Sequence, residues 1–295
     1  MKAGDIIGLC RFEHWVKNIL VLLPPFFVCA IFNAGMPLRA AACFISFSLV
    51  ASAVYAVNDI FDRERDSRHP VKCRRPIASG AVGVNAAVVL VAILAAVGFG
   101  LVCAAHAPAG ALVTLALYFA ANAAYSAKLK NAPIFDIFIL ASGFVFRIFF
   151  GGFFFGVPIS SWLFLCVFSG ALFFACGKRK SELARIGADS RPVLKFYTAK
   201  FLDAHYYMFC GLSILFYCLW TISRTDTHNL ELALAVPVLI FILVRYNLRV
   251  ESGECDGDPV PLFLHDKWLV AATLLFALIN FFALYHGSAA PCLEY

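Results

Sequence analysis

The sequence predicts an all-α integral membrane protein with nine transmembrane helices. Hydrophobic residues make up 62% of the chain and charged residues 14%, against roughly 45–50% and 25% in a soluble domain. The apolar residues also gather in nine runs long enough to cross a bilayer. Because no soluble domain, tandem repeat or low-complexity segment fits between these runs, we expect one membrane domain covering residues 1–295.

Each predicted span is one of these apolar runs, with ends defined to within several residues. We expect the second span to continue as a helix beyond the bilayer, because acidic residues follow it directly. The first run resembles a secretory signal, but Pro24 and Pro25 in its middle and the lack of a small-residue cleavage site favour a retained span. The predicted spans are 17–34, 40–58, 84–105, 110–125, 134–156, 161–177, 205–223, 230–246 and 267–286.

Basic residues predict the orientation of these spans. Of the 24 Lys and Arg residues, 21 fall on one side of a nine-span topology, whereas Arg39 and Arg224 fall on the other and Arg147 lies within a span. This asymmetry places the N-terminus and the long polar loops in the cytoplasm. The opposite loops are short, so we expect a cytoplasm-facing active site. The net charge of +6 reflects this topology and gives no reason to expect nucleic acid. Tryptophans near the predicted span ends are Trp15, Trp162, Trp220 and Trp268.

The most informative motif follows the second run and has the pattern N-D-x-x-D-x-x-x-D. On an α-helix, Asp59, Asp62 and Asp66 fall within about 60° of one another. Three carboxylates on one face repel each other, and a divalent cation would relieve that repulsion. Oxygen ligands favour Mg²⁺, which commonly also binds substrate phosphates. The motif therefore predicts a metal–diphosphate site at the membrane surface.

A basic, proline-containing loop follows the aspartates. Four cations after three acids in a short loop suit a metal-bound polyphosphate. We expect Arg68, Lys72 and Arg75 to bind it, whereas a role in topology alone is as plausible for Arg74. His69 fits a loop hydrogen bond better than a metal ligand.

Two ionisable residues lie within the predicted fifth span. Asp136 and Arg147 are eleven residues apart on the same helix face, about 16 Å along the axis, which is too far for direct pairing. Such groups face a polar cavity or a polar partner because their burial in lipid is costly. A shared wet cavity and a structural role, such as hydrogen bonding of Arg147 to backbone carbonyls, both remain open.

Three further features of the spans are a charged pair after the sixth span, a glycine pattern in the fifth and the scattered cysteines. Lys178 and Glu182 share a helix face four residues apart, whereas a snorkelling role fits Lys180. Gly152 and Gly156 form a GxxxG pattern that favours helix packing. The eleven cysteines contain no C-x-x-C pair and fit small apolar packing residues.

These motifs resemble the UbiA-type membrane prenyltransferase superfamily, and more closely its decaprenyl-phosphate phosphoribosyltransferase branch. The resemblance covers about residues 11–286, with one departure at Phe12, where the branch usually has proline. Aromatic prenyltransferases of the superfamily carry a second aspartate-rich motif where this chain has Lys178 and Arg179. The matching residues are Asn58 to Asp66, His69-Pro70, Arg75 to Gly80, Trp15-x-Lys17-Asn18, Tyr125-Ser126, Leu129-Lys130, Asp136, Ala141 to Phe144 with Arg147, and Gly177-Lys178-Arg179 with Glu182-Leu183.

The resemblance implies a UbiA-like bundle around a cytoplasm-facing cavity in a bacterial inner membrane. It implies transfer of 5-phosphoribose from 5-phosphoribosyl-1-diphosphate to a polyprenyl phosphate, giving a precursor of activated arabinose. Whether the protein forms a homo-oligomer stays open. Mg²⁺ would be held by Asn58, Asp59, Asp62 and Asp66, with Lys17 and Arg68 also at the reaction centre. The implied substrate-binding residues are Lys72, Arg75, Tyr125, Lys128, Lys130, Asp136, Arg147, Lys178, Arg179 and Glu182.

Three other functions are alternatives to this one. A UbiA-type enzyme could use a prenyl diphosphate donor and an aromatic or other acceptor, including a tetrapyrrole. A transporter or lipid-phosphate flippase would also carry intramembrane charge and broken helices, but the short non-cytoplasmic loops argue against alternating access. A scaffold role leaves the three aspartates unexplained.

Overall fold

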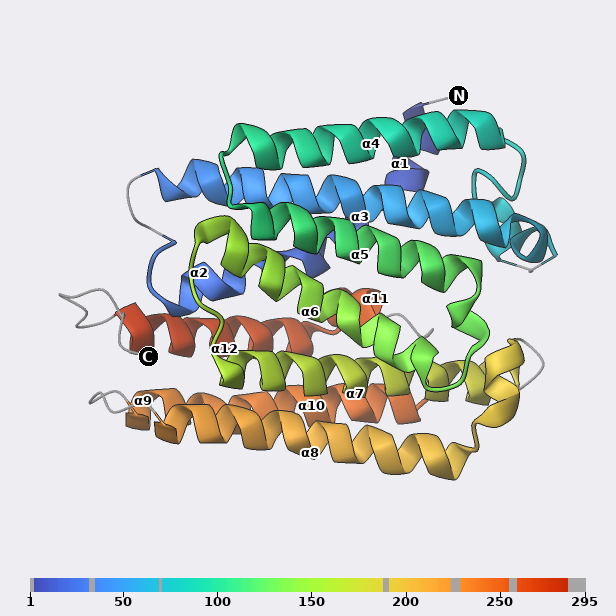
Figure 1. Cartoon of the computed structure of the whole chain (residues 1–295). Helices are drawn as coiled ribbons and strands as arrows, with labels where there is room; N and C mark the ends of the chain where they lie inside the picture. The colour runs from blue at the N-terminus through green and yellow to red at the C-terminus, as the bar shows by residue number, and fades with distance from the viewer. Residues whose placement is uncertain are drawn as a thin grey trace. The chain divides into compact units, whose positions relative to one another are not determined.

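The computed structural model describes residues 3–31, 35–68, 71–187, 191–223, 229–254 and 259–285, and the elements in these ranges are α and 3₁₀ helices (Figure 1). His69, Pro70 and Arg224 lie outside the described residues. The elements are α1 Ala3–Cys10, η1 Phe12–Leu22, α2 Leu23–Phe27, α3 Met36–Ser67, η2 Lys72–Arg74, α4 Val84–Ala104, α5 Ala109–Ala127, η3 Leu129–Asn131, α6 Phe135–Phe155, α7 Ser161–Ile186, η5 Pro192–Phe196, α8 Ala199–Ser223, α9 Asn229–Ala233, α10 Ala235–Glu251, α11 Pro259–His265 and α12 Lys267–Tyr285.

Within the described ranges, eight helical segments are long and apolar enough to cross a membrane. They correspond to the second through ninth predicted spans, with α9 and α10 together covering the eighth. The predicted count of nine is therefore not confirmed. The predicted extension of the second span is confirmed, because α3 runs for 32 residues and carries all three aspartates of the motif.

The first predicted span, 17–34, does not form a long α-helix in its described part. A 3₁₀ helix over Phe12–Leu22 is followed by the five-residue helix α2. Two consecutive prolines in α2 lack the backbone N–H groups that a continuous α-helix needs. The 3₁₀ helix also has poorer hydrogen-bond geometry and is seldom long. The segment nevertheless packs against α3 and supplies buried Asn18 and Val21.

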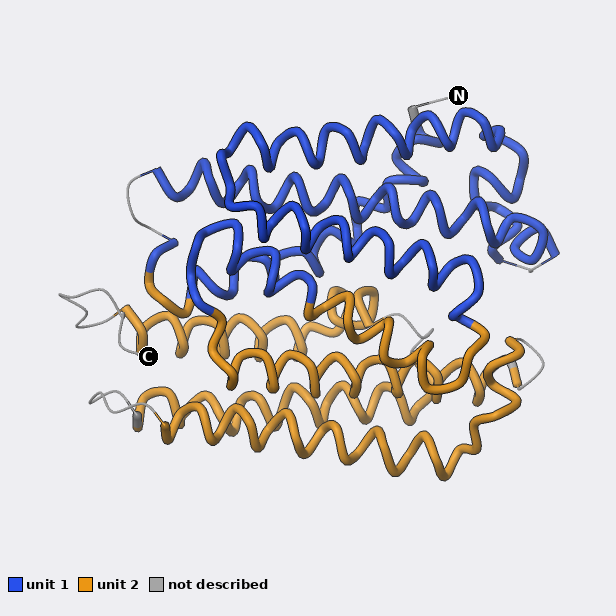
Figure 2. The backbone as a smooth tube through the Cα atoms, viewed as in Figure 1, with its two compact units in different colours: residues 1–26, 30–130, 146–158 blue, residues 27–29, 131–145, 159–295 orange. Residues whose placement is uncertain are grey.

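The backbone divides into two compact units, which are coloured separately in Figure 2. Unit 1 contains residues 1–26, 30–130 and 146–158, and unit 2 contains residues 27–29, 131–145 and 159–295. The two ends of α6 therefore belong to different units. The single-domain assignment for residues 1–295 stays a prediction.

Unit 1 is organised around α3, which packs against α4, α5 and η1. The core includes Phe47, Tyr118 and Phe150, whose rings lie against one another with centroids 4.7 and 5.3 Å from that of Phe47. A close backbone approach depends on Gly151 of α6, because a Cβ there would lie 1.9 Å from the Val21 carbonyl oxygen. This contact joins α6 to η1 and allows no larger side chain.

The predicted GxxxG packing is not confirmed at Gly156. This residue has a φ of +68° and nothing within 4 Å of the position its Cβ would take. Its left-handed conformation follows the end of α6, which is a common role for glycine after a helix. Gly156 therefore serves the turn rather than a helix contact, whereas Gly151, five residues earlier and outside the GxxxG pattern, makes the close approach.

Unit 2 is built from α7 and α8, which lie side by side, and from α10 and α12. Its core is rich in aromatic rings. The Phe173 and Tyr206 rings stack with centroids 4.4 Å apart, and Tyr246 meets Phe173 edge-on at 5.5 Å. Such ring pairs contribute specific geometry in addition to apolar burial. These contacts pack the middle of α7, which leads to the basic motif, against α8 and α10.

Candidate functional site

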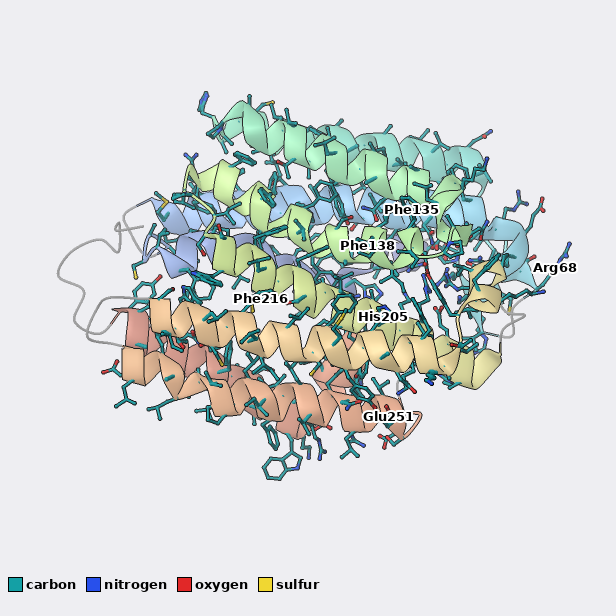
Figure 3. All side chains as sticks on the ribbon, turned by 60° about the horizontal axis from the view of Figure 1, so that its bottom comes forward. Arg68, Phe135, Phe138, His205, Phe216 and Glu251 are labelled. Atoms are coloured by element: carbon teal, nitrogen blue, oxygen red, sulfur yellow. The ribbon has the colours of Figure 1, made fainter. Side chains whose placement is uncertain are left out.

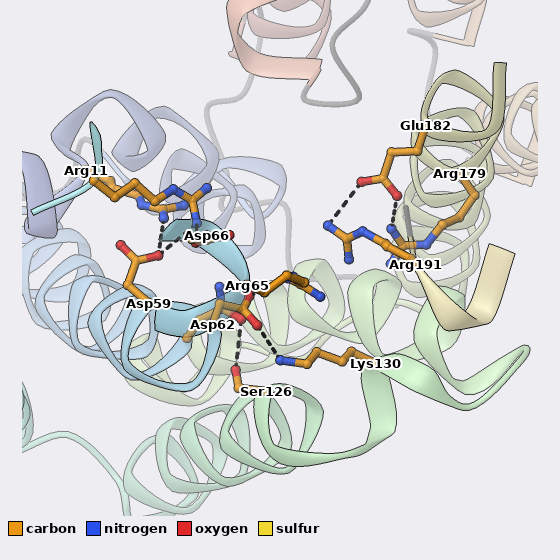
Figure 4. A network of polar contacts seen from close by, with 12 residues as sticks. Arg11, Asp59, Asp62, Arg65, Asp66, Ser126, Lys130, Arg179, Glu182 and Arg191 are labelled. Atoms are coloured by element: carbon orange, nitrogen blue, oxygen red, sulfur yellow. Dashed lines mark hydrogen bonds and ion pairs between the residues drawn. The ribbon is translucent and has the colours of Figure 1, made fainter. Parts of the chain in front are cut away.

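The three aspartates of the sequence motif lie together at the C-terminal end of α3, as predicted. Asp59, Asp62 and Asp66 are 3%, 5% and 1% exposed. Burial of three carboxylates requires polar or charged partners, because an unpaired buried charge is strongly unfavourable. Each carboxylate has a positively charged partner from unit 1 (Figure 4).

Two arginines converge on one oxygen of Asp59. Arg11 Nη2 lies 2.5 Å and Arg75 Nη1 lies 3.1 Å from Asp59 Oδ1. The same Arg75 nitrogen lies 2.6 Å from Asp66 Oδ2. A single guanidinium nitrogen thus bridges two of the three carboxylates. Arg11 precedes η1 and Arg75 follows η2, so the contact depends on how both loops fold back onto α3.

Asp62 is paired with two other cations. Lys130 Nζ lies 2.5 Å from its Oδ1, and Arg65 Nη2 lies 2.8 Å from its Oδ2. Arg65 is on the same helix at a spacing of three residues, whereas Lys130 belongs to η3 after α5. Nearby, the Ser126 hydroxyl donates a 3.2 Å hydrogen bond to Asn58 Oδ1. Figure 4 shows Lys130 and Ser126 approaching α3 from the neighbouring chain segment.

The mutual repulsion of the aspartates is relieved here by the chain's own arginines and lysine. Repulsion alone therefore does not require a metal, contrary to the sequence argument. Among the described residues, no three His, Cys, Asp or Glu side chains form a metal-binding group. The donor set still fits Mg²⁺ chemically, because it consists of carboxylate oxygens. The Arg75 nitrogen between Asp59 and Asp66 marks a place where a positive charge is held by two carboxylates at once.

The other predicted site residues of unit 1 differ in their exposure to solvent. Arg68 follows α3 and is exposed, with its side chain projecting outward in Figure 3. Lys128 follows α5 and is also exposed. Three residues are partly buried and each makes contacts within the protein, namely Lys17 on η1, Lys72 on η2 and Tyr125 near the end of α5.

Arg147 belongs to a separate buried polar group of unit 1. It is 4% exposed, and its Nε donates a 2.9 Å hydrogen bond to Asn18 Oδ1. The Asn18 amide in turn donates to the Ser48 hydroxyl at 2.9 Å. The guanidinium carbon lies 5.1 and 5.5 Å from the ring centroids of Phe47 and Tyr118. Arg147 thus makes the polar and cation–π contacts that make a charge tolerable within a span.

In unit 2, the predicted residues Asp136, Arg179 and Glu182 form one buried network. Arg179 is fully buried, and its Nε and Nη1 lie 2.5 Å from Asp136 Oδ2 and from Glu182 Oε2. Arg191 Nη2 lies 3.3 Å from Glu182 Oε1 (Figure 4). Lys178 is partly buried and interacts electrostatically with Glu182. Arg179 therefore connects the start of α6 to the C-terminal end of α7.

Tyr197 completes this network. Its hydroxyl donates a 2.5 Å hydrogen bond to Asp136 Oδ1 and accepts one of 2.7 Å from the Ile134 backbone N–H. Burial and the hydrogen bond to Asp136 raise the pKa of the Tyr197 hydroxyl, so it remains a neutral donor. Both oxygens of the fully buried Asp136 are thereby satisfied.

Sequence reasoning did not assign Arg11, Tyr197 or Arg191 to the site. Arg11 had a usable signal, since it is a basic residue six residues before the first predicted span. Arg191 had a weaker one, because it is one of several basic residues in the loop between the sixth and seventh predicted spans. Tyr197 had none, because a tyrosine in a polar loop does not indicate which carboxylate it contacts. Its partner lies 61 residues away in the chain.

The long apolar helices define a multi-pass integral membrane protein, and clusters of buried ion pairs lie at the helix ends. Residues 22–265 match the UbiA prenyltransferase family, and the chain belongs to that family of transferases. It is 34% identical to decaprenyl-phosphate phosphoribosyltransferase of Corynebacterium glutamicum, over 96% of this chain and 87% of the relative. The Mycobacterium tuberculosis enzyme of the same name is 32% identical, over 90% of each chain.

Solved structures share the fold. A UbiA homologue from Archaeoglobus fulgidus bound to GPP and Mg²⁺ aligns with a TM-score of 0.73 and 17% identity, covering 95% of this chain and 99% of that one. The apo structure of a UbiA homologue from Aeropyrum pernix K1 aligns with a TM-score of 0.61, covering 93% and 98%. The predicted UbiA-like, all-helical fold is confirmed, whereas the cytoplasm-facing cavity stays a prediction.

Proposed function

We propose that the protein transfers 5-phosphoribose from 5-phosphoribosyl-1-diphosphate to a polyprenyl phosphate. The product, a polyprenylphosphoryl-5-phosphoribose, is a precursor of activated arabinose, and the setting is a bacterial inner membrane with the site on the cytoplasmic side. Support comes from relatives of 32–34% identity that carry this activity in their names. The observation that carries the proposal is the aspartate cluster interleaved with Arg11, Arg75 and Lys130.

The cluster suits a diphosphate leaving group. Asp59, Asp62 and Asp66 would hold Mg²⁺, with Asn58 beside them. When bound there, the ion acts as a Lewis acid that draws charge from the departing diphosphate. Arg75 and Lys130, already at the carboxylates, supply charge-assisted donors for its oxygens. Arg68 and Lys72 extend this positive surface along the loop.

The acceptor needs little activation. A lipid monophosphate carries roughly 1.5–2 negative charges at neutral pH, so its oxygen is already a nucleophile and no strong general base is required. Loss of diphosphate gives oxocarbenium character at ribosyl C1, and attack from the opposite face inverts that centre. Lys17, Tyr125, Lys128 and Arg147 are proposed to line the path of the two substrates.

The ribose 5-phosphate is proposed to bind at the basic motif of α7. Lys178 is the direct ligand in this proposal, because it is partly exposed. Arg179 and Glu182 belong to the buried network with Asp136, and this network fixes the end of α7 that carries Lys178. A lysine and an arginine suit a second phosphate better than a second metal.

The test uses membranes that contain the expressed protein, Mg²⁺, polyprenyl phosphate and donor labelled in the ribose. Label that moves into organic solvent supports the proposal. Failure of transfer, together with consumption of a prenyl diphosphate in the presence of an aromatic acceptor, would contradict it and favour prenyl transfer. Uptake of intact donor into sealed vesicles without product would instead favour a transporter.

A further inference from the structure

Among the described residues, the three carboxylates of the aspartate cluster contact more cationic side chains than there are carboxylates. Three carboxylates, Asp59, Asp62 and Asp66, meet four cations. These cations are Arg11, Arg65, Arg75 and Lys130. A divalent ion alone would enter a cluster in which four of the six carboxylate oxygens already contact guanidinium or ammonium groups of the described residues.

From this geometry we infer that Arg11 and Arg75 exchange partners when the donor binds. In the structure Asp59 contacts both guanidinium groups and Asp66 contacts that of Arg75, and in the exchange the diphosphate oxygens replace these carboxylates. The metal ion and the diphosphate then bind as a coupled pair and each binds weakly alone. This inference rests on the proposed function and adds Arg11 as a residue that binds the diphosphate.

The coupling follows from the cost of leaving a buried charge unpaired. For a metal ion to bind Asp59 Oδ1 and Asp66 Oδ2, Arg75 must give up contacts of 3.1 and 2.6 Å. Without a new anion, its displaced guanidinium loses its carboxylate partners at a position only 27% exposed, which is unfavourable. A diphosphate supplies that anion and accepts bidentate arginine bonds. By linkage, diphosphate must strengthen metal binding by the same factor that metal strengthens diphosphate binding.

Arg11 is placed for the same exchange. Its side chain is 17% exposed, and its guanidinium carbon lies 5.2 Å from the centroid of the Tyr55 ring. This cation–π contact keeps the guanidinium near the cluster after it leaves Asp59. Arg11 and Arg75 contact the same oxygen of Asp59. A ligand that binds one of these arginines therefore also changes the contact that the other makes with Asp59.

The experiment measures Mn²⁺ binding by electron paramagnetic resonance on the purified full-length protein in detergent, with and without inorganic pyrophosphate. For the wild type we expect pyrophosphate to tighten Mn²⁺ binding by at least about tenfold. In Arg75→Gln, Mn²⁺ alone should bind several-fold more tightly than to the wild type, and the pyrophosphate effect should shrink. Arg11→Gln should change both quantities in the same directions. Arg74→Gln, at an exposed neighbouring position, is the matched control and should behave as the wild type does.

The outcomes separate the inference from the proposed function. Coupled binding in the wild type that persists unchanged in folded Arg75→Gln and Arg11→Gln would overturn the exchange alone. Weaker binding of Mn²⁺ alone to both variants would overturn it as well, because it would make the arginines supports of the metal ligands. Absence of Mn²⁺ binding to the wild type, even with pyrophosphate, would overturn the metal–diphosphate function itself. Thermal melting of each variant identifies the ones that fold.

Discussion

Tyr197 donates a hydrogen bond of 2.5 Å to Asp136, a carboxylate that is fully buried and that also receives Arg179 at 2.5 Å. The contact ties the segment after η5 to the start of α6. Because both oxygens of Asp136 have a partner, the charge is tolerated without solvent. The network is thus a support for the end of α7, where the proposed phosphate ligand Lys178 lies.

Tyr197→Phe should destabilise the protein by about 1–3 kcal/mol, because it leaves one oxygen of a buried carboxylate without its donor. The ring itself is retained, so its stacking on Phe201 at 5.6 Å is kept. Tyr207→Phe is the matched control, since it removes an exposed tyrosine–carboxylate bond to Glu251. Thermal unfolding in detergent measures both. An equal, small loss in the two variants would show that burial of the Asp136 network contributes nothing.

Asp62→Asn should reduce turnover more than about 100-fold, because one proposed metal ligand is lost. This reduction corresponds to about 3 kcal/mol of transition-state stabilisation. The variant keeps the size of the side chain and should still insert into membranes. Glu64→Gln, an exposed change on the same helix, is the control and should keep wild-type activity. Steady-state transfer of ribose label to lipid is the measurement, and undiminished activity in Asp62→Asn would contradict the metal assignment.

Lys178→Ala should raise the apparent KM for the soluble donor far more than that for the lipid, because Lys178 is proposed to bind the ribose 5-phosphate. Lys180→Ala is the control: Lys180 pairs with Asp203 at 2.6 Å and with Glu251, outside the proposed site. KM values for both substrates are compared in the two variants. Equal effects of Lys178→Ala on donor and lipid would remove the basis for placing the phosphate there.

Asp266 predicts a specific acid sensitivity. Burial opposes its ionisation, but hydrogen bonds from Arg249, Arg245 and the backbone N–H groups of Leu269 and Trp268 outweigh burial and lower its pKa to about 2. A lowered pKa means that the unfolded chain takes up the proton first as the pH falls. The stabilisation is therefore complete above about pH 4 and is lost progressively towards about pH 2.

Asp266→Asn separates charge from helix capping. The asparagine still caps α12, whose first N–H groups the aspartate accepts at 2.9 and 3.3 Å. It loses the ion pairs with Arg245 and Arg249. Melting temperatures between pH 2 and pH 6 should fall less steeply in Asp266→Asn than in the wild type. Parallel curves for the two proteins would contradict the assignment of acid sensitivity to this residue.

The gathering of the aspartates and the positions of eight apolar helices were predictable from local pattern. Helix periodicity places residues 59, 62 and 66 on one face in any sequence that forms a helix there. An apolar run of about 20 residues likewise predicts a span without knowledge of its neighbours. The first predicted span is not confirmed as a long helix in its described part, where two consecutive prolines interrupt the backbone hydrogen bonding of α2.

Composition, run length and motif spacing are local properties of the chain, so they suffice for the membrane class, the family resemblance and the helix face of the aspartates. Which cations contact these aspartates is a property of the folded chain. Arg11 reaches Asp59 across 48 residues and Lys130 reaches Asp62 across 68. Such pairs depend on which helices pack together and on how far each loop extends. Burial makes each pairing necessary, but only the folded chain brings the partners within reach.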